Sequence, residues 1–249
     1  MQVLNLRPTL SGQTKINKLC FRLPFNYQPI TAYKKGVLAM VIVERDREIL
    51  MLVYRFKFCL GRHVMALVKF TGARSCDRRL TALTNAGYLA RKKYLYGLPY
   101  LYTVTHKGRI LIGANKRENK IRLEQINHDI KVLDTLIRFK EKYGFSLADM
   151  ESERELHIKD GFGTRKHHPD FVFLNNGKRY AVEIELTLKA RNNLERNIRD
   201  NYLNYDNQVW VTEDNKVLAT LHNLSNEYGN MEILRFEDFP KMGESKCQK

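Results

Sequence analysis

An Asn-Gly step between two alternating apolar runs constrains the fold of this chain more than any other feature. The runs His168–Phe173 and Tyr180–Lys189 flank the segment Asn175-Asn176-Gly177. Asn-Gly in this setting is typical of a tight hairpin turn, because both residues accept the positive φ that such a turn needs. The sequence therefore predicts two antiparallel strands joined by a short turn.

The second of these strands alternates apolar and polar residues. Successive side chains of a strand point to opposite faces, so one face is predicted to be core and the other to carry Glu183 and Glu185. The predicted core face consists of Tyr180, Val182, Ile184 and Leu186. Asp170 lies on the neighbouring strand, where its carboxylate can converge with the other two. Three carboxylates at one sheet edge favour a Mg²⁺ site, and the alternative is a solvated, charged strand face.

At these residues the sequence resembles the PD-(D/E)xK nucleases, whose core runs helix, three strands, helix, strand. The motif is Pro169-Asp170, then Glu183-x-Glu185, with Lys189 further on. Glu185 stands where that superfamily usually has Lys, although some of its restriction endonucleases carry Glu there. The resemblance implies that Asp170 and Glu183 bind Mg²⁺ or Mn²⁺ and that Glu185 or Lys189 orients or activates a water.

Glu153, from the segment Glu153-Arg154-Glu155, and His168 are accessory candidates. His167 and His168 directly precede Pro169-Asp170 and can touch a substrate phosphate. Loop histidines are more often bystanders. For Lys189, a solvated lysine at the start of a helix is the alternative to a functional role.

The net charge of +16 is confined to the first part of the chain. Residues 1–113 hold 20 Lys and Arg against 4 Asp and Glu, whereas residues 114–249 hold 23 of each. An excess this one-sided favours a polyanionic partner, and nucleic acid is the first choice. An anionic membrane surface is the weaker choice, because the basic segment has no long amphipathic helix with exposed apolar residues.

The apolar runs and the cysteines indicate the compartment. The longest apolar run, Val37 to Val43, is far too short to span a membrane, and the N-terminus does not have the layout of a signal peptide. The four cysteines form no CxxC pair, which gives little support to a zinc site or a disulfide framework. We therefore expect reduced thiols, a cytoplasmic location and no membrane partner.

Residues 1–113 are predicted to form two parts. Residues 1–36 carry six basic residues and no acidic one, and are expected to form a basic arm. Residues 37–113 are expected to form a winged helix-turn-helix. Its predicted elements are a helix over 44–58, a helix over 62–68, a helix from an N-cap at Ser75 to Gly87, strands over 88–96 and 100–104 that form a wing, and a helix from a Thr105 cap through Ile112.

The third helix and the wing carry clustered cations with polar and aromatic neighbours. A recognition helix of this kind lies in the major groove, and such side chains suit contacts to phosphates and base edges. The predicted DNA-binding residues are Arg74, Ser75, Arg78 and Arg79 on the helix and Arg91, Lys92, Lys93 and Tyr94 on the wing. The alternating tyrosines of the wing are equally typical of packing on its inner face.

Residues 114–240 are predicted to form the nuclease-like domain, with an αβββαβ core, before a disordered tail over 241–249. The expected elements are a helix over 116–143, a strand over 151–158, a loop over 159–167, the two motif strands, a helix after Lys189, a strand over 208–211, a helix over 217–224 and a strand over 233–236. The expected fold is thus a two-domain α+β and α/β protein.

The whole arrangement, over roughly residues 44–237, resembles the replication-relaxation family of mobile-element proteins. The first domain contributes the stretches Leu80–Leu89 and Leu101–Gly108, and the second contributes Glu153–Leu156 with the motif above. The resemblance implies DNA as partner, together with replication or transfer proteins of a plasmid or other mobile element.

Two functional hypotheses follow from the sequence. The first is a Mg²⁺-dependent DNA endonuclease or nickase that the winged helix delivers to its site. The second is a non-catalytic accessory factor or repressor whose second domain is a degenerate nuclease fold, which the Glu at position 185 favours. The oligomeric state is left open.

Overall fold

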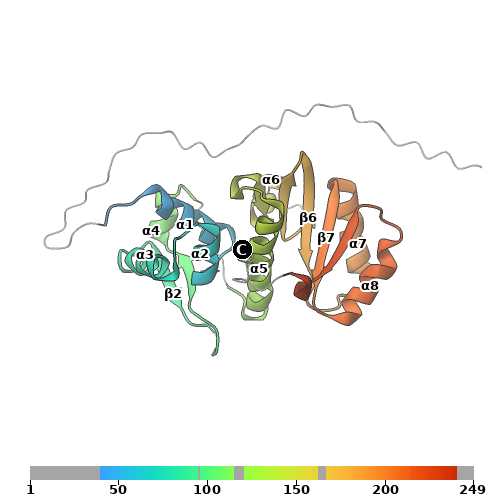
Figure 1. Ribbon diagram of the computed structural model, residues 1–249, viewed down its shortest axis with the longest axis horizontal. Coiled ribbons are helices and arrows are strands. Elements are labelled where there is room, and N and C mark those ends of the chain that lie inside the picture. Colours follow the sequence, from blue (N-terminus) through green and yellow to red (C-terminus); the bar gives the residue numbers. More distant parts are fainter. Residues whose placement is uncertain (1–39, 95, 115–120, 162–166, 240–249) are drawn as a thin grey trace, which may run out of the picture. The chain divides into compact units, whose positions relative to one another are not determined.

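The described residues have mixed α/β structure with two sheets, one of three strands and one of five (Figure 1). The computed structural model describes residues 40–94, 96–114, 121–161 and 167–239, and those from Ile42 onward belong to one compact unit. The predicted basic arm over 1–36 and tail over 241–249 lie outside the described residues. Nowhere in the described ranges is a helix both long and apolar enough to cross a membrane.

Four helices surround the three-stranded sheet. The elements are α1 (Glu44–Arg55), β1 (Cys59–Leu60), α2 (Gly61–Leu67), α3 (Ala73–Asn85), β2 (Leu89–Lys92), β3 (Leu101–Val104) and α4 (His106–Leu111). Strand β3 lies between β1 and β2 and is antiparallel to both. The four predicted helices are present, but the first ends at Arg55 instead of 58, and β1 was not predicted. The two wing strands are shorter than predicted, because their pairing ends where Lys92 meets Leu101.

Local chemistry sets the ends of these helices. Helix α3 begins two residues before the predicted cap, so Ser75 lies in its first turn and donates to the Gly72 carbonyl at 2.7 Å. Thr105 caps α4 as predicted, accepting from Gly108 N at 3.1 Å. No residue with a Cβ fits at position 108, because that Cβ would lie 2.3 Å from the Tyr88 carbonyl oxygen.

The five-stranded sheet has the order β4-β5-β6-β7-β8, antiparallel up to β6 and parallel beyond it. Its elements are α5 (Ile126–Tyr143), β4 (Met150–Ser152), α6 (Glu153–Asp160), β5 (Phe171–Asn175), β6 (Lys178–Ile184), α7 (Arg191–Asn204), β7 (Asn207–Thr212), α8 (Asn215–Ser225) and β8 (Met231–Arg235). Short 3₁₀ helices cover Leu123–Gln125, Leu147–Asp149 and Phe236–Asp238.

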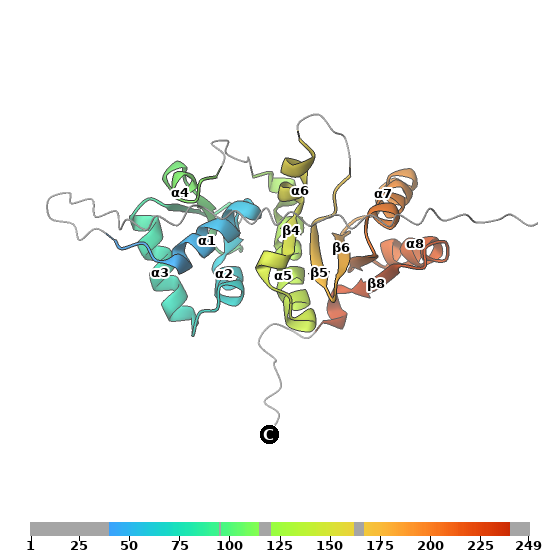
Figure 2. The same ribbon diagram turned by 90° about the horizontal axis from the view of Figure 1, so that it is seen from above.

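Helices cover both faces of this sheet (Figure 2). On one face α5 packs through Phe139, whose ring meets those of Phe171 and Phe173 edge-on at 6.1 and 5.8 Å. On the other face Trp210 of β7 is buried in a cluster contributed by α7 and α8, namely Leu194, Ile198, Val217, Leu221 and Leu224. Because successive side chains of a strand point to opposite faces, the sheet separates an aromatic layer against α5 from a layer of Trp210 and aliphatic residues against α7 and α8.

The strand predicted over 151–158 is wrong beyond Ser152, where the chain turns into α6. Ser152 Oγ accepts from Glu155 N, and the Glu155 carboxylate accepts from Ser152 N at 2.9 Å. This reciprocal capping box satisfies two backbone donors and starts a helix. The predicted loop over 159–167 is also partly wrong, since α6 runs through Asp160, and residues 162–166 lie outside the described ranges.

The predicted helix over 116–143 begins later, at Ile126, and ends at Gly144 with φ +70°. Residues 115–120 are outside the described ranges. The first turns of α5 reach the three-stranded sheet, because Ile126 and Ile130 share a buried cluster with Phe58, Leu60 and Leu101. The helix therefore contributes to the cores of both sheets.

Cys59 and Cys76 are buried free thiols. Burial raises the pKa of Cys76 to about 11 and raises the pKa of Cys59 as well. Both therefore stay protonated and unreactive at neutral pH.

His63 in α2 is fully buried, and its hydrogen bonds favour the neutral ring. Nδ1 accepts from Leu60 N at 3.2 Å, so Nε2 is the protonated nitrogen and donates to Asp134 Oδ1 at 2.9 Å. Arg62 donates hydrogen bonds from Nε and Nη2 to both oxygens of the same carboxylate. Burial lowers the pKa of His63 by more than Asp134 raises it. A second ring proton would point at the Leu60 N–H and find no acceptor.

We expect the contribution of His63 to stability to fall as the pH drops below about 6.5, because the unfolded chain then protonates His63 and the folded chain does not. The His63→Gln variant should be less stable than wild type by about 1–3 kcal/mol at pH 7.5. This gap should narrow between pH 7 and pH 5, since only the wild type carries the penalty. Urea denaturation at each pH measures it, and a constant gap would contradict a neutral His63.

Candidate functional site

The β5–β6 hairpin brings Asp170 to the position opposite Glu183. The turn residues Asn176 and Gly177 have φ +49° and +75°, and Phe171 pairs with Val182, so the next step of the register sets Asp170 against Glu183. Asp170 Oδ2 accepts a hydrogen bond from Ile184 N at 2.7 Å. Asp170 interacts electrostatically with both Glu183 and Glu185 at this edge of the sheet. We refer to these three residues as the carboxylate cluster.

Each carboxylate of the cluster has a cationic partner. His128 Nε2 of α5 lies 3.5 Å from Asp170 Oδ2, His167 Nε2 lies 2.5 Å from Glu183 Oε1, and Lys189 Nζ lies 2.6 Å from Glu185 Oε2. Asn201 of α7 donates to the same Glu183 oxygen at 2.9 Å. The cluster is therefore neutralised by groups from three separate segments of the chain.

Burial and these partners pull the pKa values in opposite directions. Burial raises the pKa of Glu183 and of Glu185, and His167 and Lys189 offset this only in part. Burial by itself raises the pKa of Asp170. The pairing with His128 lowers this pKa, and the net result is a pKa below the ordinary value of an aspartate. Burial lowers the pKa of His128, whereas Asp170 and Asp129 raise it, to about 11. Asp170 and His128 thus form an ion pair at neutral pH.

The carboxylate oxygens that these partners do not contact are suited to binding a hard cation. In the described residues the hydrogen bonds and ion pairs of the cluster use one oxygen of each carboxylate, which leaves Asp170 Oδ1, Glu183 Oε2 and Glu185 Oε1. No three His, Cys, Asp or Glu side chains in these ranges are arranged as a metal cage. Mg²⁺ is usually held by one or two carboxylates, waters and substrate phosphates, so Asp170 and Glu183 fit its donor chemistry.

The predicted separation of faces holds for the middle of β6. Val182 and Ile184 are buried behind the cluster, and Glu183 and Glu185 are only 5 % and 3 % exposed. Tyr180 and Leu186, predicted as core, are only partly buried. Glu185 lies just past the end of β6, but its N–H still bonds the Val211 carbonyl at 2.9 Å. Lys189 precedes α7, with a side chain 47 % exposed.

The two accessory candidates lie in different surroundings. His168 is directed away from the cluster: its ring is buried, Nε2 lies 3.2 Å from Asp160 Oδ2, and the ring meets His157 edge-on. The adjacent His167 is the one that contacts Glu183. Glu153, at the start of α6, lines a pocket together with Asp170.

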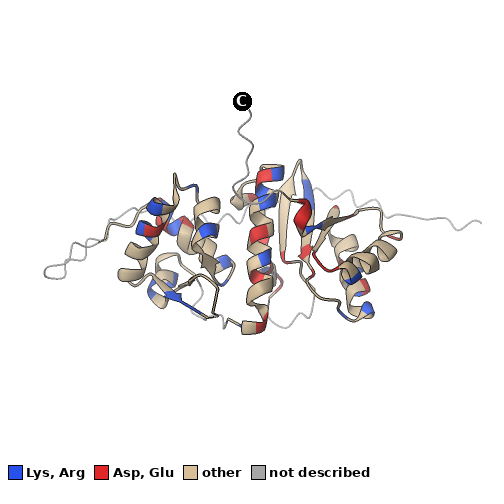
Figure 3. Cartoon of the chain, turned by 60° about the horizontal axis from the view of Figure 1, so that its bottom comes forward, with Lys and Arg blue, Asp and Glu red and all other residues tan. Residues whose placement is uncertain are grey.

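Most predicted DNA-binding residues of α3 and the wing are exposed. Arg74, Arg78, Arg91, Lys92 and Lys93 all face solvent (basic positions are blue in Figure 3). Arg79 is a correction: its guanidinium is paired with the fully buried Asp46, so it is not displayed for a ligand. Tyr94 is partly buried against the Phe58 cluster, and Ser75 is occupied with the start of α3.

The sequence does not predict that His128 and Asn201 lie beside the cluster, and it predicts for His167 only a possible contact with substrate phosphate. His167 carried a weak signal, because it lies three positions before Asp170 on the approach to the motif strand. His128 and Asn201 carried none, because only the packing of α5 and α7 brings them to the strand ends.

Comparisons of the chain with protein-family models, with curated proteins and with solved structures found no match.

In the presence of a chelator, Glu183→Gln should make the protein more stable, because it removes a buried charge and keeps an acceptor for Asn201. We expect about 0.5–2 kcal/mol at pH 8, the usual range for a stabilising substitution. The difference in stability between Glu183→Gln and wild type should shrink as the pH falls. Because the pKa of Glu183 is raised, the wild-type carboxylate takes up a proton at a higher pH than an ordinary glutamate and also becomes neutral. Chemical denaturation measures this. Glu195→Gln, on the exposed side of α7, is the control, and a destabilised Glu183→Gln would contradict the argument.

Proposed function

We propose that the protein is a DNA-binding, divalent-metal-dependent endonuclease or nickase that acts in the processing of plasmid or other mobile-element DNA. The observation that carries the proposal is the convergence of Asp170, Glu183, Glu185 and Lys189 at the carboxyl end of β6. Their types and order match the PD-(D/E)xK pattern except at Glu185.

The arrangement around the three-stranded sheet supports a winged helix as the DNA-binding part. Its elements follow the order α1-β1-α2-α3-β2-β3, with α3 exposing Arg74 and Arg78 and the β2–β3 hairpin exposing Lys92 and Lys93. After the six basic residues of the arm are set aside, residues 40–113 still hold 14 Lys and Arg against 4 Asp and Glu. This charge favours a duplex phosphate backbone as the ligand.

The five-stranded sheet supports a PD-(D/E)xK-like catalytic part. A helix, three antiparallel strands, a helix and a parallel strand correspond to α5, β4, β5, β6, α7 and β7, with α6 inserted after β4. The candidate site falls at the strand ends, beside the start of α5. A fold of this type hosts both active and inactive proteins, so the chemistry has to be argued from the site.

The chain's own residues suit phosphodiester hydrolysis. A Mg²⁺ held by Asp170 and Glu183 would polarise a phosphate oxygen and lower the pKa of a water. Glu185, whose pKa is raised by burial, can accept a proton from a water near the strand end. Lys189, 2.6 Å from Glu185, supplies at this point the cation that the pattern usually takes from position 185. It can orient the water or neutralise charge on the phosphate.

The second candidate is a non-catalytic DNA-binding accessory factor or repressor. The internal neutralisation of the cluster favours it, because His128, His167 and Lys189 already balance the three carboxylates. In a protein that binds no metal, these cations would be needed to neutralise the three carboxylates. In an enzyme the ion would have to bind through the carboxylate oxygens that these pairs leave open.

Supercoiled plasmid incubated with the protein and Mg²⁺ or Mn²⁺ should be nicked or linearised. Asp170→Asn should reduce the rate at least about 10²-fold, as expected when charge stabilisation at the reacting phosphate is removed. Divalent ion should also raise the Tm of the wild type and not that of Asp170→Asn, because ligands that bind only the folded state stabilise it. Agarose gels and thermal unfolding measure the two effects.

Glu232→Gln, which removes an exposed carboxylate of β8, is the matched control and should nick normally. Nicking that survives both Asp170→Asn and Glu183→Gln would place the activity elsewhere or in a contaminant. Absence of both nicking and metal stabilisation would favour the accessory factor.

The quadruple variant Arg74→Ala, Arg78→Ala, Lys92→Ala, Lys93→Ala should bind duplex DNA more weakly. The slope of log K against log salt should become shallower by about 0.9 for each phosphate that the variant no longer neutralises. Arg79 is kept, because removing it would leave Asp46 buried without its partner. Fluorescence anisotropy at several salt concentrations measures the slope. Lys178→Ala with Lys216→Ala is the control, and an equal weakening there would contradict a winged-helix interface.

A further inference from the structure

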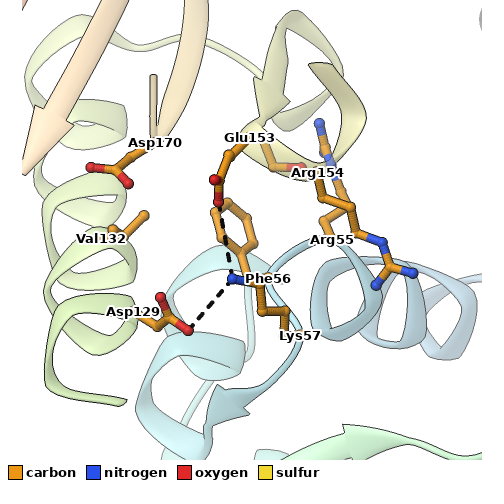
Figure 4. Close-up of a pocket in the computed structure, with 9 residues that line it drawn as sticks. Arg55, Phe56, Lys57, Asp129, Val132, Glu153, Arg154 and Asp170 are labelled. Atoms are coloured by element: carbon orange, nitrogen blue, oxygen red, sulfur yellow. Dashed lines mark ion pairs between the residues drawn. The ribbon is translucent and has the colours of Figure 1, made fainter. Parts of the chain in front are cut away.

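A pocket beside the carboxylate cluster contains a lysine from the first part of the chain. Its lining includes Lys57, Asp129, Glu153 and Asp170, and Figure 4 shows the Lys57 side chain between Asp129 and Glu153. Lys57 Nζ is 3.8 Å from Asp129 Oδ2 and 4.0 Å from Glu153 Oε2. These distances are too long for hydrogen bonds, so within the described ranges the three ammonium donors of Lys57 remain available.

The other cations of the pocket are committed. Arg55 donates to the Glu155 carboxylate and to the carbonyls of Leu147 and Met150. Arg154 donates to the Tyr54 carbonyl at 2.8 Å and lies over the Tyr54 ring. Among the cations that line this pocket, Lys57 is therefore the one placed to take a new anionic ligand.

The backbone of Lys57 has an unfavourable conformation. Its φ is +68°, and Phe58 N donates to the Phe56 carbonyl at 2.7 Å across it, which makes a tight three-residue turn. This left-handed region favours glycine, and a lysine there is strained. Such strain concentrates at binding and catalytic sites, where the side chain has a task that glycine lacks.

We propose that Lys57 binds the phosphate of the DNA strand on which the carboxylate cluster acts, which makes it a residue of the active site; this rests on the proposed function. A phosphodiester that reaches Asp170 and Glu183 adds negative charge to a cluster whose own cations are occupied. Lys57 lines the same pocket as Asp170 and holds uncommitted donors. It offsets that charge, as lysines commonly do for phosphate.

The test separates this role from a structural ion pair by replacing Lys57 with the residue its backbone prefers. Lys57→Gly should lower the nicking rate at saturating plasmid by about 10²-fold. Its Tm should stay unchanged or rise by up to about 4 °C, because the strain is relieved. Lys69→Gly is the matched control, since Lys69 is exposed and also has a positive φ, of +55°. It should show the same trend in Tm and normal nicking.

A second readout does not depend on catalysis. Acetylation of lysines by acetic anhydride, followed by mass spectrometry, should slow at Lys57 when saturating duplex DNA is added in CaCl₂. Lys131 is the internal reference, because its side chain is 26 % exposed against 28 % for Lys57 and it is also ion-paired. Its acetylation should not change.

The outcomes distinguish the two proposals. Normal nicking by Lys57→Gly overturns the role of Lys57 and leaves the endonuclease standing. A wild type that never nicks, with Lys57 protected by DNA, overturns the endonuclease and keeps Lys57 as a phosphate contact. Unprotected Lys57, or a Tm that falls while nicking is unaffected, shows that Lys57 serves only as an ion pair within the fold.

Discussion

The tight turn at Asn176 and Gly177 fixes the register of β5 against β6, and the candidate site depends on that register. Both turn residues have positive φ, which leaves Asn175 paired with Lys178 and carries the ladder up to Phe171 and Val182. A shift by one residue would send every side chain of β6 to the other face. Glu183 would then point into the aromatic layer of α5, and Asp170 would lose its bond from Ile184 N. Two small residues thus determine where three carboxylates lie.

Keeping these carboxylates together opposes folding, and the surrounding segments offset the cost. Buried ionised groups are costly unless they are paired and hydrogen-bonded. His128 comes from α5, His167 from the approach to β5 and Lys189 from the approach to α7, so the site is complete only when all three segments have docked. The raised pKa values of Glu183 and Glu185 indicate that the compensation is partial. A bound cation would relieve the remainder, which makes this edge of the sheet suited to a metal.

Features set by local sequence could be predicted, whereas features set by packing could not. The Asn-Gly hairpin, the Thr105 cap and the helical spacing of α1 depend on neighbours in sequence, and these predictions are confirmed. Helix α6 was missed because alternation in Glu151–Ile158 outweighed the Ser152 and Glu155 capping signal, which was present in the sequence. Arg79 looked exposed on a helix that carries other arginines, but its partner Asp46 lies 33 positions earlier. The partners of the carboxylate cluster likewise come from distant segments, and no local pattern marks them.

The segment from Arg55 to Phe58 links the structure around the two sheets and explains why a strained lysine can persist there. Arg55 is bonded to three acceptors around β4 and α6, and Phe58 is fully buried in a cluster shared with α5. Because the chain is held at Arg55, two positions before Lys57, and at Phe58, directly after it, the turn at Lys57 has little freedom to relax, and its φ of +68° is imposed by the structure on either side. The held backbone sets where the Lys57 side chain leaves the main chain before any ligand arrives. On the proposed role, less backbone entropy is lost when its ammonium meets a phosphate, and such pre-organisation favours a transition-state contact.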